Sequence, residues 1–419
     1  MKNFISDSPK KKSAWCFSFN HGSDDQQSIN IVVKDLLEYI YSFPESDFVA
    51  DSRDQIISSL PFPKSVEDAI APEFLSLSTL KWSLFQLRNQ VMNADMLPTK
   101  IIENCKKNPQ IYSEKYANPD NRSTFLEYFT LTKDETKALR IACRAHGVTI
   151  TNALSAAILS LTSSFYQNDD QNMDIKTKKL RFLLSVGLRP FGATNPRNEV
   201  PSVLTTIPVN DEKIKSGRVS PLQIGSEDWT QGTVACASGA VDFVVSVPSS
   251  TAIQAREMSE RDNNVENIYD DNASESLWKL AEECRDMAKD IIEVNRYVPE
   301  SVRLFGFGMK YANILTIVDM EAKNPGTMGR GYSCGVSNVG LVNLPSPPSV
   351  SIRNSDSCIR INSAYYGTSH ARNGVYCLLS SITVGETFCG CLQFTSPFIS
   401  KDEAKRFKNG LIAMLRSFN

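Results

Sequence analysis

Segments with helix-like and strand-like hydrophobic patterns follow one another along this chain without strict alternation. Apolar residues at three- and four-residue steps predict amphipathic helices, and short runs rich in β-branched and aromatic residues predict strands. Helices are expected at 28–43, 132–147, 149–165, 274–294 and 400–418, and strands at 13–20, 125–131, 180–188, 202–209, 233–247, 356–366, 373–384 and 387–395. A doubly wound parallel sheet needs regular strand–helix alternation. The pattern therefore favours an α/β (α+β) fold with mixed β-sheets flanked by helices.

Local signals mark where several of these segments begin and end. Ser/Thr-x-x-Glu capping boxes at 132–135 and 400–403 predict two helix starts. Gly147 is placed to end the first of these helices, and 385–386 lies between two strand-like runs as a tight hairpin turn.

Proline is frequent between residues 61 and 121, among short helical stretches, which indicates a connecting region. At 419 residues, the chain is long enough for about two domains of ordinary size. We expect residues 1–97 to belong to an N-terminal domain, 98–121 to form a crossover connector and 122–419 to form a C-terminal domain.

The charge balance argues against nucleic acid as a partner. The chain has 45 basic and 47 acidic residues, so it lacks the large positive field that a phosphate backbone requires. The polar start, with Lys10-Lys11-Lys12, does not resemble a secretory signal. No segment approaches the ~18 apolar residues of a membrane helix. We expect a cytoplasmic protein. The amphipathic C-terminal segment 400–418 leaves peripheral contact with the endoplasmic reticulum or lipid droplets as an alternative.

The ten cysteines are scattered and form no Cys-x-x-Cys knuckle. Cys389 and Cys391 are the one close pair, and they lack the further ligands of a zinc site. We expect buried, reduced thiols and no metal. A phosphate-binding loop of Gly-x-x-x-x-Gly-Lys type is also absent from the sequence, so no bound cofactor is expected.

The three histidines differ in their surroundings. His146 falls at the end of a predicted helix, where a cation interacts favourably with the helix dipole, and His370 falls in a polar stretch that reads as a surface loop. His21 ends an aromatic strand-like run and precedes Asp25 by four residues. A general base that works near neutral pH is most often a histidine, so His21 is the candidate base.

The residues around His21 resemble the motif of the chloramphenicol acetyltransferase-like (His-x-x-x-Asp) acyltransferase superfamily. Residues 17–28 read Phe-Ser-Phe-Asn-His-Gly-Ser-Asp-Asp-Gln-Gln-Ser, and Asp-Leu-Leu follows at 35–37. The branch that looks nearest is the fungal alcohol acetyltransferases. Further matches in family order are Leu-Pro-Phe-Pro at 60–63, Cys-Arg-Ala-His-Gly-Val-Thr at 143–149, Val-Gly-Leu-Arg-Pro at 186–190 and Val-Ser-Asn-Val-Gly at 336–340.

The resemblance implies a two-domain fold with a tunnel between the domains. Acetyl-CoA or another acyl-CoA would enter as cosubstrate from one side, and a small hydrophobic alcohol or amine from the other. His21 would deprotonate the acceptor as it attacks the thioester, without a covalent acyl-enzyme. Asp25 would hold the motif through an ion pair with Arg189. Ser337 and Asn338 match the family's Ser-Asn-x-Gly segment near the tunnel, where a hydrogen bond to the oxyanion is one role and a simple strand-end turn is the other.

The chain departs from the family pattern in two ways. Asn20 stands where relatives carry a first histidine, and Gln26 stands where they carry a glycine that suits the turn. On the order of a hundred residues usually precede the signature and supply strands to the first domain. Only twenty precede it here, so we expect either that the first domain is incomplete or that the gene model starts late. The alternative function is therefore a non-catalytic or remnant relative that acts as a binding protein, and a condensation domain for carrier-bound acyl groups is a third reading.

Overall fold

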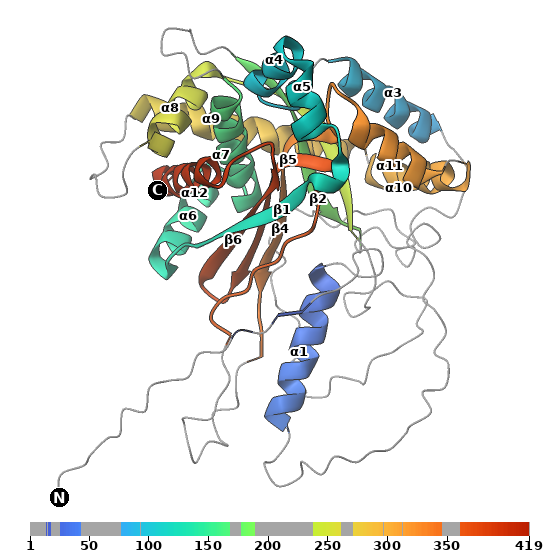
Figure 1. Cartoon of the computed structure of the whole chain (residues 1–419). Helices are drawn as coiled ribbons and strands as arrows, with labels where there is room; N and C mark the ends of the chain where they lie inside the picture. Colours follow the sequence, from blue (N-terminus) through green and yellow to red (C-terminus); the bar gives the residue numbers. More distant parts are fainter. Residues whose placement is uncertain are drawn as a thin grey trace, which may run out of the picture.

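A mixed six-stranded β-sheet forms the centre of the computed structural model (Figure 1). The structure describes residues 14, 16–17, 26–42, 77–92, 94–167, 177–188, 238–260, 271–295, 297–311, 313–345 and 361–418. The strands are β1 (Ser123–Thr130), β2 (Lys178–Gly187), β3 (Ser238–Val247), β4 (Arg330–Val342), β5 (Gly374–Val384) and β6 (Thr387–Ser396), in the spatial order β1-β6-β5-β4-β2-β3.

The pairing of these strands is mixed, as the sequence predicts. Strand β4 runs parallel to both of its neighbours, β2 and β5. The pairs β1–β6, β5–β6 and β2–β3 are antiparallel. The strand expected at 233–247 starts later, at Ser238, within the described residues. The strands expected at 13–20 and 202–209 lie outside the described residues, apart from three positions of the first.

Helices pack around this sheet (Figure 1). They are α1 (Gln26–Ser42), α3 (Leu77–Val91), α4 (Thr99–Lys107), α5 (Pro109–Ile111), α6 (Lys133–Ala145), α7 (Ile150–Phe165), α8 (Ser249–Glu260), α9 (Asp271–Lys289), α10 (Tyr297–Tyr311), α11 (Ile314–Lys323) and α12 (Lys401–Ser417). Short π-helical turns η2 (Tyr112–Tyr116) and η6 (Asp290–Val294) and a 3₁₀ turn, η3 (Pro119–Asn121), complete the set. The helices expected at 28–43, 132–147, 149–165, 274–294 and 400–418 are confirmed.

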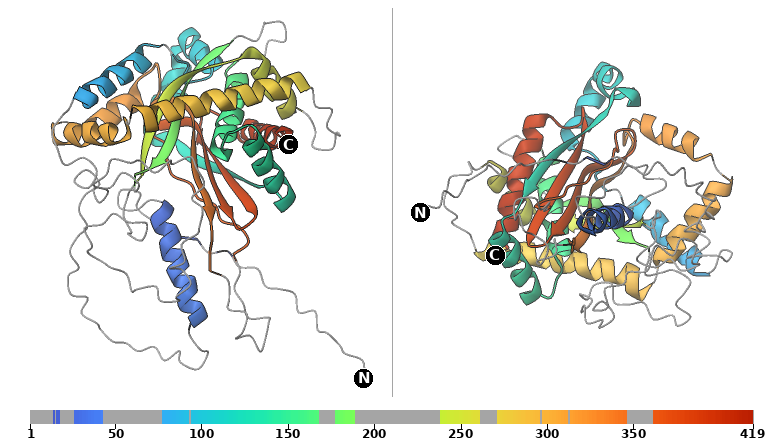
Figure 2. Two further views of the ribbon diagram at one scale, coloured as in Figure 1. Left: turned by 180° about the vertical axis from the view of Figure 1, so that it is seen from behind. Right: turned by 90° about the horizontal axis from the view of Figure 1, so that it is seen from below.

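Helix α7 lies at the centre of the main hydrophobic core. All of its residues from Asn152 to Ser164 are buried, because the helix packs on β2, β3 and β4 while α8, α9 and α12 surround it (Figure 2). Helix α12 buries its apolar residues there too, including Phe407 and Leu411. The apolar face that could have lain on a lipid surface is therefore covered by the protein itself.

The capping signals are confirmed in detail. Thr132 with Glu135, and Ser400 with Glu403, form reciprocal capping boxes at the starts of α6 and α12. Gly147 follows α6 with a φ of 64°, in the left-handed region that favours glycine. The hairpin at 385–386 joins β5 to β6.

Residues 361–370, which we call the crossing segment, form no strand, so the strand expected at 356–366 is wrong for its described part. The segment instead runs over side chains at alternate positions of β1. The His370 N–H donates to Thr124 Oγ1 at 3.1 Å, and the Tyr365 ring meets the Tyr128 ring with centroids 5.1 Å apart. Side-chain contacts replace strand pairing here.

The expected domain division at 98–121 remains a prediction. Those residues form α4, α5, η2 and η3 and lead directly into β1. Within the described ranges no single helix is long and apolar enough to cross a bilayer; α6 and α7 pass that test only as a pair bent by 98°.

Candidate functional site

The signature residues His21, Asp25 and Arg189 lie outside the described residues. Helix α1 is described, and it begins at Gln26, the residue directly after Asp25 in the sequence. Figures 1 and 2 show α1 beneath the lower end of the sheet, and it contacts β4. The helix that follows the signature therefore packs on the strand that carries Ser337 and Asn338.

Asn338 joins three elements through its side-chain amide. Its Nδ2 donates to Thr151 Oγ1 in the first turn of α7 at 3.0 Å. Its Oδ1 accepts from Ser381 Oγ on β5 at 3.1 Å and from the Gly340 N–H at 3.0 Å. The pairing of β4 with β5 shifts between Asn338 and Leu341, so the amide fixes the point where the strand becomes irregular.

Ser337 faces the crossing segment. The Tyr366 hydroxyl lies 2.5 Å from the Ser337 carbonyl oxygen and 3.1 Å from Ser337 Oγ. Burial raises the pKa of Tyr366 to about 12, so the phenol stays protonated at neutral pH and can donate to the carbonyl. The sequence motif thus places Ser337 and Asn338 together at one end of β4, with partners from different elements.

Polar side chains continue from Ser337 across the sheet. Ser337 pairs with Ser380 on β5, and Ser380 Oγ accepts from Gln393 Nε2 on β6 at 2.6 Å. Gln393 Oε1 accepts from the Thr368 N–H at 2.7 Å. These groups are hydroxyls and amides. Such a site can hold or polarise a substrate oxygen, but a proton acceptor for neutral pH must come from another residue.

His370 is not a surface residue, contrary to the expectation from sequence. Only 8% of its surface is exposed. Burial, and then the positive charge of Arg330, lower its pKa to about 4, so the imidazole is neutral. His146 is an exposed residue at the end of α6 and stacks on Trp278, with ring centroids 3.9 Å apart. Neither histidine lies in the polar site around Ser337.

Two buried arginines were missed by the sequence reasoning. Arg330 is fully buried and its guanidinium donates to the carbonyl oxygens of His370, Ala371 and Val375 and to Thr395 Oγ1. Burial, and then the charge of Arg122, lower the pKa of Arg330 to about 9. The second buried arginine is Arg122, whose guanidinium donates to the carbonyl oxygens of Met328 and Ala322. Both arginines thus anchor chain turns at the start of β4. Their sequence signal is only an isolated basic residue beside a strand.

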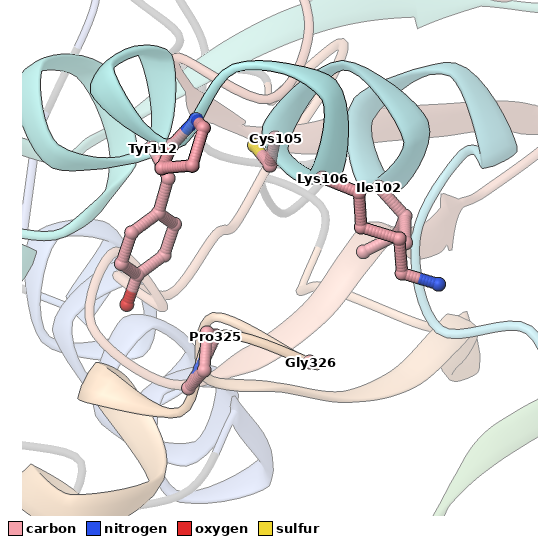
Figure 3. Close-up of a pocket in the computed structure, with 7 residues that line it drawn as sticks. Ile102, Cys105, Lys106, Tyr112, Pro325 and Gly326 are labelled. Carbon is pink, nitrogen blue, oxygen red and sulfur yellow. The ribbon is translucent and has the colours of Figure 1, made fainter.

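A cavity of about 320 Å³ lies at the opposite end of β4 from the polar site (Figure 3). It sits between the α4–α5 helices and the turn after α11, where the Tyr112 side chain reaches down toward Pro325. Eight residues of strand separate Arg330, beside this turn, from Asn338, a span of about 26 Å. The lining residues are Ile102, Cys105, Lys106, Pro109, Tyr112, Pro325 and Gly326.

Within the part of the chain that the structure describes, no three His, Cys, Asp or Glu side chains gather as metal ligands. Cys391, next to Cys389 on β6, is buried, and burial raises its pKa to about 12. Burial also raises the pKa of Cys389. A thiol with a raised pKa is a poor nucleophile and a poor metal ligand.

No family model and no curated protein matches the sequence. Among solved structures, the TRI3 trichothecene 15-O-acetyltransferase from Fusarium sporotrichioides is similar over 94% of this chain and 64% of its own length, with a TM-score of 0.50 and 12% identity. The two chains share a fold, a mixed sheet flanked by helices. At this identity the likeness shows a shared fold alone. The chain spans less than two thirds of the acetyltransferase's length.

Two further structures overlap most of the chain. The epimerization domain of the third module of tyrocidine synthetase B is similar over 95% of this chain and 67% of its own, with a TM-score of 0.49 and 8% identity. The condensation domain of the monacolin K polyketide synthase MokA is similar over 94% and 67%, with a TM-score of 0.47 and 11% identity.

Proposed function

We propose that this chain is an acyltransferase that transfers an acyl group from acyl-CoA, with acetyl-CoA as the first donor to test, to the hydroxyl or amine of a small hydrophobic acceptor. One observation carries the proposal: α1, which starts directly after the His21–Asp25 signature, contacts the strand that carries Ser337 and Asn338. This contact supports the proposal that the two motifs, which are far apart in the sequence, contribute to one site. The link to fungal alcohol acetyltransferases rests on the sequence motifs.

In the proposed reaction, the His21 imidazole takes the proton of the acceptor while the acceptor oxygen or nitrogen bonds to the thioester carbonyl carbon. The carbonyl oxygen becomes an oxyanion, and it collapses as the carbon–sulfur bond breaks. The proton returns from His21 to the thiolate, so that free CoA and an ester or amide leave. Asp25 and Arg189 hold the base in place through an ion pair.

Asn338 suits the role of oxyanion donor in one respect. A side-chain amide nitrogen carries two hydrogens, and one of them is used on Thr151 Oγ1. The second has no acceptor among the described residues, so it could serve a substrate oxygen. The bonds from Ser381 and Gly340 hold the amide in one orientation, so it would need little reorganisation during the reaction.

The test is CoA release by the purified full chain with acetyl-CoA and a panel of hydrophobic alcohols and amines. We expect His21→Ala to lower the rate by about 10²-fold or more, because general base catalysis contributes factors of that size. His146→Ala is the matched control, since His146 is exposed and stacks on Trp278, and it should keep the wild-type rate.

Equal CoA release by wild type and His21→Ala would refute the proposed mechanism. Calorimetry with CoA then separates the alternatives. A chain that binds CoA but transfers nothing is a non-catalytic relative, whereas a chain that does neither is not an acyl-CoA protein.

A further inference from the structure

Helix α3 turns its leucines toward solvent. Leu77, Leu80, Leu84 and Leu87 recur at three- and four-residue steps, and we call them the leucine stripe. Their exposed fractions are 70%, 56%, 58% and 56%. Single exposed leucines are ordinary on protein surfaces, but four on one helix face form a continuous apolar strip. The strip is about 15 Å long, from the rise of 1.5 Å per residue.

The opposite face of α3 makes the contacts that fix the helix's rotation. Thr79 Oγ1 donates to Glu300 on α10 at 2.5 Å. Gln86 Nε2 donates to Asp242 on β3 at 2.9 Å, and Asn89 Nδ2 donates to the Asp242 carbonyl oxygen at 3.3 Å. These bonds are buried or partly buried. Turning the leucines inward would break these hydrogen bonds to Glu300 and Asp242, so the bonds favour the observed rotation of the helix.

Aromatic packing holds the same orientation. Trp82 is 3% exposed, and its ring lies 5.1 Å from the ring of Tyr297 on α10. Phe85 packs on the same tyrosine at 5.6 Å. The inward face therefore has its own apolar anchor, and the leucine stripe is not needed to attach α3 to the fold.

The charged residues of α3 are all positive. Lys81 and Arg88 are exposed and border it, and neither forms an ion pair with another described residue. The α3 sequence, LSTLKWSLFQLRNQV, contains no Asp or Glu. An apolar strip edged by cations suits a surface that is apolar inside and negative outside, which describes a bilayer with anionic headgroups.

A second copy of this chain fits less well. A two-fold interface brings the same patch of each copy together. Here it would place Lys81 and Arg88 of both copies side by side, with no acidic residue of α3 to neutralise them. Like charges across an interface are unfavourable.

We propose that the leucine stripe of α3, bordered by Lys81 and Arg88, docks this protein on the surface of membranes that contain anionic lipids. The stripe sits in the acyl–headgroup boundary and the two cations meet the headgroup phosphates and carboxylates. This role is independent of the chemistry proposed for the polar site around Ser337.

The experiment is sedimentation of the full chain with phosphatidylcholine vesicles, with and without phosphatidylserine. We expect binding to the phosphatidylserine vesicles that weakens as salt is added. Leu80→Ser with Leu84→Ser should reduce the partition coefficient at least about tenfold, because each substitution removes a large apolar side chain from the boundary. Lys81→Gln with Arg88→Gln should reduce it several-fold and remove the preference for phosphatidylserine.

Matched controls come from other helices. Ile141 on α6 is 56% exposed, equal to Leu80, so Ile141→Ser tests general surface hydrophobicity. Lys405→Gln with Arg406→Gln removes two exposed cations of α12. Both controls should bind as wild type does. An unchanged unfolding midpoint shows that each variant keeps its fold.

Three results would overturn the proposal. The first is absence of vesicle binding by wild type, including the case of a dimer that the leucine variant converts to a monomer. The second is binding that does not depend on phosphatidylserine. The third is an equal loss of binding in Ile141→Ser.

Discussion

Arg330 donates a hydrogen bond to the carbonyl oxygen of His370. Both ring nitrogens of His370 are buried and have no hydrogen-bond partner among the described residues. Its pKa is lowered from 6.5 to about 4, by burial and then by the charge of Arg330. The unfolded chain takes up this proton near pH 6.5, while the folded protein resists it until about pH 4. The contribution to stability is therefore complete above pH 6.5 and is lost as the pH falls through this window.

We predict that wild type loses about 2 kcal/mol of unfolding free energy from this group between about pH 7 and about pH 5. His370→Gln, which cannot titrate, should lose correspondingly less over the same range. Denaturant unfolding at the two pH values measures this. His146→Gln is the control and should keep the full wild-type loss. If His370→Gln shows that full loss too, another group is responsible.

Residue patterns identified Ser337 and Asn338 but could not say what they bind. Their partners, Tyr366, Thr151 and Ser381, come from three other elements, and local sequence carries no record of such pairings. The burial of His370 was missed for the same reason: it depends on how the crossing segment lies over β1.

At the scale of elements, β1 and β6 show how one small residue permits a cross-strand contact. Phe129 on β1 is paired directly with Gly390 on β6. A Cβ added at Gly390 would overlap the Phe129 ring. The glycine therefore lets the ring lie flat over the neighbouring strand, the arrangement that aromatic side chains use to compensate for a strand glycine.

Gly390→Ala should lower the free energy of unfolding by about 2 kcal/mol, because the overlap forces Phe129 off its position. In a Phe129→Leu background the same substitution should cost less. A thermodynamic cycle of the four proteins gives the coupling. Gly331→Ala on β4 is the control, since a Cβ there meets nothing within 4 Å. Additive effects in the cycle would mean that the ring is not the obstacle.

Elements with strong local signals were predicted well. The orientation of α3, in contrast, could not be predicted from local sequence. Capping boxes, Gly147 and the hairpin at 385–386 gave boundaries for α6, α12 and β5–β6, because the atoms that decide them are close in sequence. The three- and four-residue spacing alone would predict that α3 buries the face formed by Leu77, Leu80, Leu84 and Leu87. Their actual direction is set by Glu300 and Asp242, which are far along the chain.

At the scale of the whole molecule, four buried cysteines from different elements lie in one hydrophobic core. Cys143, Cys284, Cys334 and Cys377 come from α6, α9, β4 and β5 and belong to a single hydrophobic cluster, each at most 1% exposed. Burial raises the pKa of Cys143 and of Cys334 to about 12. The native thiols should therefore be unreactive.

We predict that these four cysteines become alkylated together, at a rate set by global unfolding, as denaturant is raised. Mass spectrometry of peptides follows each site separately. Cys16 is exposed and should react at once, as an internal control. If one of the four reacts well before the others, the core opens in parts and the elements do not unfold as one unit.

The strand order has a consequence for synthesis on the ribosome. Among the described strands, β1 is bonded only to β6, which is also the last strand to emerge. Until then the backbone N–H and C=O groups of β1 lack their sheet partner, while nearly all the intervening chain is being made. Such a non-local pairing forms late. The nascent chain must therefore keep an unpaired, aromatic strand from aggregating until β6 has been synthesised.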